Sequence, residues 1–355
     1  MLMRLKRIRD AYWCSRRGFT LVELLVTIVI ISILASLTLA GLAGARNRSK
    51  IGKTESTIRK VADVVQPLFD SYFDRRVGLG TSGGNAIHIA ALRLTALRRL
   101  QSLEIPERLT DFLPATAAYL PPSNPLPALV TGTSPMAEMQ IAWQMTPLGG
   151  SALSVSGTAT DTPRTAIRFA NYRYARPDWN RTSRQYETAE CLYMLLAASP
   201  HVDPAEMEQF RPDEIGDSDD QPDGAFEILD GWGKPVFFLR WAPGFVSLLQ
   251  PETPTSLDPL DSLRLQSASN GFPRNAYQLT PLVYSPGPDG IADIRNSADS
   301  ATWSYAQSTY NTALPASAQF NPFDDAAVGF GAFTDTDGDG RNGSRDNITN
   351  HDMRR

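Results

Sequence analysis

The sequence predicts an α+β protein with a long N-terminal helix and a small antiparallel sheet toward the C-terminus. Three observations lead to this prediction. Residues 19–45 are apolar apart from one acid, residues 58–72 place apolar side chains at helical spacing, and the β-type segments gather after residue 230. A small sheet that follows a long helix can bury its apolar face against that helix, which is an α+β arrangement.

The segment 19–45 is long enough to cross a membrane. Its 27 residues, at about 1.5 Å rise each, exceed the roughly 30 Å of a hydrocarbon core. Residues 1–18 form a basic leader with six basic side chains and Asp10 as its only acid. Because basic residues favour the cytoplasmic side, we expect the N-terminus inside and the C-terminal bulk outside. Two alternatives stay open: a secretory signal peptide cleaved near residues 40–43, and a plain membrane anchor.

The single acid of this segment is Glu23, five residues after Gly18. A carboxylate inside a membrane-length apolar helix is costly, which indicates a partner for it. The order Gly-Phe-Thr-Leu-Val-Glu at residues 18–23 resembles the cleavage and assembly motif of the type IV pilin and type II secretion pseudopilin superfamily. The resemblance covers about the first fifth of the chain.

This resemblance implies that a prepilin peptidase cuts between Gly18 and Phe19 and methylates the new N-terminal Phe19. It also implies that Glu23 pairs with the N-terminus of a neighbouring subunit during assembly. The implied partners are further copies of this chain, related pseudopilins and the inner-membrane assembly platform of a secretion system. The implied location is the inner membrane, crossed once, with the N-terminus in the cytoplasm and the head in the periplasm.

The first helix is expected to continue as an amphipathic segment over residues 46–77, because apolar side chains recur there in steps of three and four. Pro67 should bend or break it. Residues 78–230 are expected to form a helical and Pro-rich insertion, with helices near residues 86–103 and 188–198. On these helices we expect Arg93, Arg98 and Arg99 to face solvent and Cys191 to lie in the core.

Residues 231–355 are expected to form the β-rich head. Residues 235–241 read as a strand with residues 245–249 as a possible hairpin partner, and residues 277–284 read as an edge strand because of Pro281. The segments Asp-Gly-Trp-Gly-Lys-Pro (230–235) and Tyr-Ser-Pro-Gly-Pro-Asp-Gly (284–290) resemble two segments of the major pseudopilin of type II secretion. The chain departs from that pattern at Gly231, where Pro is usual, and at Lys234. From the residues alone, Trp232 is expected to pack into the core.

Acidic residues near the C-terminus have the spacing of a calcium loop. Acids stand at loop positions one, three, five and twelve, and a glycine stands at position six. Hard Ca²⁺ takes six to eight oxygen ligands, and a backbone carbonyl supplies one at position seven. The predicted ligands are Asp335, Asp337, Asp339, the carbonyl of Arg341, and Asp346, and a weaker accessory pair is Asp289 and Asp293. A solvated acidic tail is the alternative. The resemblance adds that major pseudopilins bind calcium in a C-terminal loop.

These observations predict a structural subunit rather than an enzyme. The three histidines are far apart in sequence, and no phosphate-binding loop or nucleophile elbow is found. The net charge of −4 becomes more negative without the leader, which disfavours nucleic-acid binding. The first hypothesis is a type II secretion pseudopilin that assembles into a periplasmic fibre. The alternatives are a type IV pilin or minor pilin for adhesion, motility or DNA uptake, and a membrane-anchored periplasmic binding module.

Overall fold

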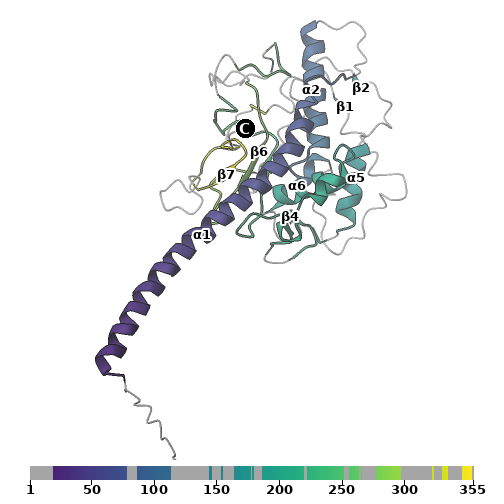
Figure 1. Ribbon diagram of the computed structural model, residues 1–355. Coiled ribbons are helices and arrows are strands. Elements are labelled where there is room, and N and C mark those ends of the chain that lie inside the picture. The colour runs from purple at the N-terminus through teal and green to yellow at the C-terminus, as the bar shows by residue number, and fades with distance from the viewer. Residues whose placement is uncertain are drawn as a thin grey trace, which may run out of the picture. The chain divides into compact units, whose positions relative to one another are not determined.

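The computed structural model describes eight longer stretches of the chain and several short pieces. Apart from 178–179, which is a short piece between two of them, the longer stretches are 19–77, 86–112, 164–176, 186–219, 222–251, 256–263, 277–296 and 346–353, and the other short pieces are 144–145, 153–154, 265, 322–323 and 330–334. The chain divides into two compact units, Met1–Ser49 and Lys50–Arg355. The longest element is helix α1, Leu21–Asp70, which begins in the first unit and ends in the second (Figure 1).

In the first unit, α1 exposes its apolar side chains from Leu21 to Leu42. An 18-residue window of this helix has a mean hydropathy of 2.5, so that its length and composition suffice to cross a membrane. In the second unit the predicted amphipathic spacing is confirmed: Ile58, Val61, Val65 and Tyr72 are all buried. The helix continues past Pro67 without a break and ends at Asp70.

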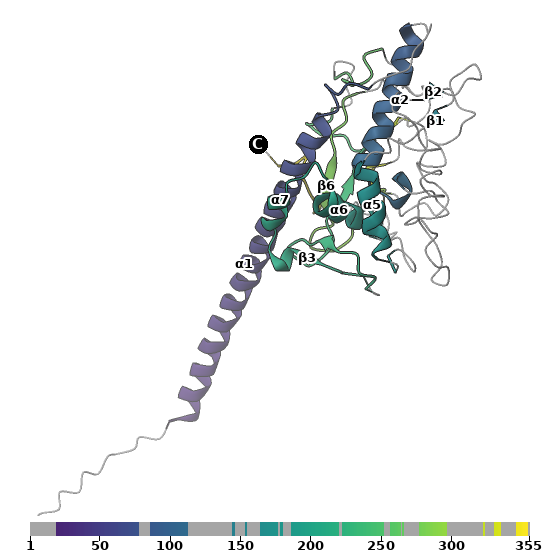
Figure 2. The same ribbon diagram turned by 90° about the vertical axis from the view of Figure 1, so that its right-hand side faces the viewer.

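Among the described residues of the second unit there are four further helices and two 3-10 turns. They are α2 (Ala86–Glu104), η1 (Leu109–Asp111), α5 (Arg164–Tyr174), α6 (Glu187–Ala198), α7 (Pro204–Glu208) and η3 (Pro212–Glu214). Helix α6 packs on strands β4 (Glu227–Ile228) and β5 (Phe237–Leu239) and on α5, and α5 packs on α2 (Figures 1 and 2). Nine of the twelve residues of α6 are buried, including Cys191, as predicted. A helix that is apolar on nearly all sides belongs inside a core.

The strands are short and antiparallel. β1 (Gln144–Met145) pairs with β2 (Leu153–Ser154), and β3 (Ile215–Gly216) pairs with β4 (Glu227–Ile228). The third sheet has the order β5-β6-β7, formed by Phe237–Leu239, Leu282–Ser285 and Ile348–Thr349. Its register sets Phe237 opposite Tyr284 and Tyr284 opposite Thr349. Side chains of β5 and β6 share one core cluster with the second half of α1, which confirms the mixed helix-and-sheet prediction.

Two strand predictions are wrong. Residues 245–249 form no hairpin with β5; the buried side chain of Gln250 instead donates to the carbonyls of Ala242 and Phe245 and holds this segment as a turn. β6 is the central strand rather than an edge. Pro281 is compatible with that position because it stands just before β6, where the ladder needs no N–H from it.

Two expectations about side chains are also wrong. Arg98 and Arg99 are buried rather than solvated, and Arg98 forms an ion pair with the buried carboxylate of Asp258. The Arg98 guanidinium lies 5.5 Å from the ring centroid of Trp241, so its charge is compensated inside the protein. Trp232 is only half-buried, whereas Trp241 is fully buried. Helix α2 therefore contributes to the core on a side that its arginine-rich sequence had predicted to face solvent.

Candidate functional site

Glu23 lies in the first turn of α1 and forms a reciprocal cap with Thr20. The backbone N–H and the hydroxyl of Thr20 each donate to Oε2 of Glu23 over 2.9 Å, and the N–H of Glu23 donates to Oγ1 of Thr20 over 3.2 Å. This is the capping-box arrangement, which pairs N–H groups that a helix start leaves unsatisfied. The Thr-x-x-Glu spacing is itself a sequence signal for this cap, and it was missed in assigning Glu23 to assembly alone.

The cap leaves this carboxylate able to take a second partner. Phe19 and Glu23 are both exposed, with Phe19 79% accessible, and Gly18 lies outside the described residues. A carboxylate offers about four acceptor positions, and both hydrogen bonds from Thr20 go to Oε2 of Glu23. The geometry around Glu23 therefore fits both a helix cap and an acceptor for an amine from another chain.

The two head segments identified in the sequence meet around Asp230. Oδ1 of Asp230 accepts from the N–H groups of Trp232 at 2.7 Å and Lys234 at 2.9 Å, which shapes the turn before β5. Oδ2 of the same side chain accepts from the hydroxyl of Ser285 at 2.6 Å, at the end of β6. Burial raises the pKa of Asp230, and the hydrogen bonds from Ser285, Lys234 and Trp232 act in the opposite direction. One buried carboxylate thus ties residues 230–235 to residues 284–290.

Gly231 marks the closest approach of this turn to α1. A Cβ at Gly231 would lie 2.3 Å from the carbonyl oxygen of Lys50, far inside van der Waals contact. The N–H of Gly231 donates to Oγ1 of Thr54 over 2.9 Å. A proline here would introduce the Cβ and remove the N–H donor. These two contacts explain why the chain carries Gly rather than Pro at this position.

The described part of the predicted metal site places Asp346 beside Asp289 and Asp293. Burial raises the pKa of Asp346, and the carboxylates of Asp289 and Asp293 raise it further. Asp293 has a left-handed backbone, with φ of 46°. A Cβ at Gly287 would lie 2.4 Å from the carbonyl oxygen of Asp346, so glycine permits the close approach of the two segments. The accessory pair from the sequence and Asp346 therefore belong to one neighbourhood.

Both ends of the predicted calcium loop reach this neighbourhood. The N–H of Thr334 donates to the carbonyl of Asp293 over 2.8 Å, and Ile294 pairs with Phe333 in an isolated bridge. Beyond the loop, the side-chain amide of Asn347 donates to the carbonyl of Ala292. Asp335, Asp337, Asp339 and Arg341 lie outside the described residues. Carboxylates gathered at one place suit a hard cation such as Ca²⁺.

The comparisons with known proteins bear on the N-terminal motif. The family model described as the prokaryotic N-terminal methylation motif matches residues 13–39. No curated protein and no solved structure matches the chain. The match spans the basic-to-apolar junction and most of the exposed apolar part of α1, which suggests membrane anchoring. The methylation motif supports a place for this chain in the type IV pilin-like or pseudopilin class, which is structural rather than enzymatic.

Proposed function

We propose that this chain is a structural pseudopilin of a type II secretion system. A prepilin peptidase removes residues 1–18, the apolar part of α1 holds the mature subunit in the inner membrane, and the head lies in the periplasm. Copies of the chain and related pseudopilins then assemble into a periplasmic fibre on the inner-membrane platform. The observation that carries this proposal is the methylation motif at residues 13–39, joined to an apolar helix with one acid in its first turn.

The head supplies a second line of support. The segments 230–235 and 284–290, which resemble two major-pseudopilin segments, are joined by the Asp230–Ser285 hydrogen bond. The departure at Gly231 has a local packing reason, so it does not count against the pseudopilin assignment. The alternative within the same class is a type IV pilin or minor pilin.

Processing is the first test. The mature chain should begin at an N-methylated Phe19, and Gly18→Ala should slow or block its formation, because the peptidase cleaves after that glycine in the proposed reaction. Mass spectrometry of the N-terminus distinguishes the possibilities. A mature N-terminus near residue 43 would instead support a secretory signal peptide.

Assembly is tested by separating the two roles of Glu23. Glu23→Gln keeps a side-chain oxygen that can accept from Thr20, so the helix cap survives, but it removes the charge that would pair with a neighbouring N-terminus. We expect normal membrane insertion and a strong loss of intersubunit crosslinks and sheared fibres. Thr27→Ala is a matched control, because among the described residues its hydroxyl donates to the carbonyl of Leu24 within the same helix. Normal fibres from Glu23→Gln would refute the charge-pairing role.

The secretion role is tested in cells that lack the chain. If the chain is a secretion pseudopilin, enzymes that are normally exported should accumulate in the periplasm of these cells. Complementation with the wild-type chain should restore their export. Loss of surface pili or of DNA uptake with normal export would favour the pilin alternative. An effect confined to binding of one ligand, with fibres intact, would favour a membrane-anchored binding module.

We further propose that Ca²⁺ orders the loop 335–346 against the segment 287–293. The support is the neighbourhood of Asp346, Asp289 and Asp293, in which like charges oppose ionisation until a cation is present. Limited proteolysis of the full chain in detergent should show slower cleavage between residues 335 and 346 in Ca²⁺ than in chelator. The double variant Asp337→Ala, Asp339→Ala should lose this protection. Equal cleavage of the wild-type chain in both conditions would contradict the proposal.

A further inference from the structure

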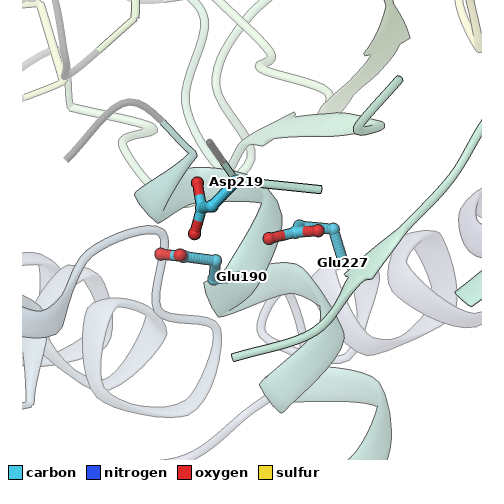
Figure 3. Close-up of side chains that lie close together, drawn as sticks. All are labelled: Glu190, Asp219 and Glu227. Carbon is cyan, nitrogen blue, oxygen red and sulfur yellow. The ribbon is translucent and has the colours of Figure 1, made fainter. Parts of the chain in front are cut away.

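A second group of acids lies away from the C-terminal loop. Glu190 comes from α6, Asp219 from the segment that follows β3, and Glu227 from β4. Carboxylate oxygens of these three residues lie within 4.8 Å of one another, and Figure 3 shows the carboxylate of Glu227 directed toward those of Asp219 and Glu190. Asp219 also belongs to a second group, with Asp217 and Asp223, whose carboxylate oxygens likewise lie within 4.8 Å of one another. Five carboxylates are therefore concentrated where α6 meets the loop 217–223.

Three of these carboxylates each accept a hydrogen bond through one of their two oxygens. The indole N–H of Trp179 donates to Oε2 of Glu190 over 2.6 Å. The N–H of Ser218 donates to Oε2 of Glu227 over 2.8 Å, and the N–H of Gly224 donates to Oδ2 of Asp217 over 2.9 Å. Each contact orients a carboxylate with a neutral donor and supplies no positive charge.

The buried oxygen Oε1 of Glu227 is the observation that points to a ligand. Glu227 is completely buried, and within the described parts of the chain Oε1 has no hydrogen-bond partner; the same holds for Oδ1 of Asp217. A buried acceptor without a partner costs about 1–3 kcal/mol, and more when it is charged. Folded proteins pair such groups with donors, water or metal ions.

The charges around this oxygen make a cation the fitting partner. Burial is the main cause, and the carboxylates of Asp219 and Asp217 act in the same direction, so that the pKa of Glu227 is raised to about 8. Burial also raises the pKa of Glu190 well above its usual range, with Asp223, Asp219 and Glu227 acting in the same direction. A divalent ion would relieve both the burial cost and the repulsion between neighbours.

We propose that Glu190, Asp219 and Glu227 bind a hard divalent cation, with Ca²⁺ the best fit. Ca²⁺ binds oxygens at about 2.3–2.6 Å, so two ligands of one ion can stand up to about 5 Å apart. The carboxylate oxygens of the cluster lie within 4.8 Å of one another, which is inside that span. Mg²⁺ demands near-ideal octahedral geometry and gives up its water reluctantly, so a set of protein carboxylates on different elements suits it less well. Asp217 and Asp223 complete the acidic loop around the ion. The bound ion fastens the segment that carries Asp217 and Asp219 to the core helix α6.

Terbium luminescence tests the site in the full-length chain. Tb³⁺ replaces Ca²⁺ at oxygen sites, and Trp179 is a built-in sensitiser because its indole nitrogen lies 2.6 Å from a carboxylate oxygen of Glu190. The protein is studied in detergent and carries Asp337→Ala and Asp339→Ala, which remove two predicted calcium ligands from the C-terminal loop. Excitation of tryptophan should produce Tb³⁺ emission that Ca²⁺ displaces and Mg²⁺ displaces poorly.

Variants then locate the ion. Glu227→Gln and Asp219→Asn should each weaken Ca²⁺ binding by about tenfold or more, because each removes a charged ligand of similar shape. Glu208→Gln is the matched control, since Glu208 is an exposed acid on the neighbouring helix α7. Asp219 is less buried than Glu227, so Asp219→Asn serves if Glu227→Gln is poorly folded by circular dichroism. The proposal would be overturned if a folded variant kept its Ca²⁺ affinity unchanged. It would also be overturned if the protein with Asp337→Ala and Asp339→Ala bound no Ca²⁺ at millimolar concentration.

Discussion

Replacing Gly231 by alanine is a direct test of the contact between the 230–235 turn and α1. The added methyl carbon would lie 2.3 Å from the carbonyl oxygen of Lys50 and 2.9 Å from both its carbonyl carbon and its Cα. These are backbone atoms of a helix, so no side-chain rotation relieves the overlap. Either the turn or the helix has to move.

The cost follows from two terms. Overpacking a close contact costs about 1–3 kcal/mol. Movement of the turn also weakens the hydrogen bond from the Gly231 N–H to Oγ1 of Thr54, which is worth about 1 kcal/mol. We therefore expect Gly231→Ala to lower the free energy of unfolding by about 2–4 kcal/mol. In a unit of the size of Lys50–Arg355 the Tm should fall by roughly 3–6 °C.

Thermal unfolding of the mature protein in detergent, followed by circular dichroism, measures this effect. Gly52→Ala is the matched control, because Gly52 is also on α1 and an added Cβ there meets nothing within 4 Å. That substitution should leave the Tm unchanged or raise it, since alanine is favoured over glycine in a helix by up to about 1 kcal/mol. An unchanged Tm for Gly231→Ala would refute the packing argument at this turn.

Three further predictions concern buried charges. In chelator, Glu227 has a pKa of about 8 in the folded state against 4.5 ordinarily, so the folded state binds more protons than the unfolded state between pH 4.5 and 8. The free energy of unfolding should therefore fall as the pH rises through that window. In melting experiments at several pH values, Glu227→Gln should flatten this fall. Burial lowers the pKa of His351 to about 4 from 6.5, so stability should fall as pH drops through that range, by about 3 kcal/mol in total, and His351→Gln should remove this loss. Asp258→Asn should cost about 3–5 kcal/mol in denaturant unfolding, because it neutralises the buried carboxylate that forms the ion pair with Arg98; a cost below 1 kcal/mol would show that other groups compensate the charge of Arg98.

Local patterns in the sequence were enough to predict helices α1, α2 and α6 and the N-terminal motif, but not α5 and α7. The spacing of Ile58, Val61 and Val65 identifies the buried face of α1, and the all-apolar character of residues around Cys191 identifies the core helix α6. Helical periodicity depends on neighbours within a few turns, so it is visible in the chain itself. The methylation motif at residues 13–39 is also contiguous, so it too is visible in the chain itself.

Partners that are distant in the chain were decided by the tertiary structure alone. The pairing of β5 with β6 replaces the expected hairpin, and β7 comes from the far C-terminus and turns the expected edge strand into the central one. Strand propensity cannot choose among distant partners, because pairing depends on which apolar faces the whole core can bury.

The charged residues show the same division. The sequence by itself showed the basic segment 1–18, the membrane-length apolar helix and the spacing of acids from Asp335 to Asp346. It could not show that Arg98 is buried against Asp258, or that Glu190 and Glu227 converge with Asp219 although 37 residues separate the two glutamates. A charge in a linear pattern is most simply read as solvated, because an unpaired charge is costly to bury. Only folding brings the counter-charges and the competing carboxylates close enough to decide which charges enter the core.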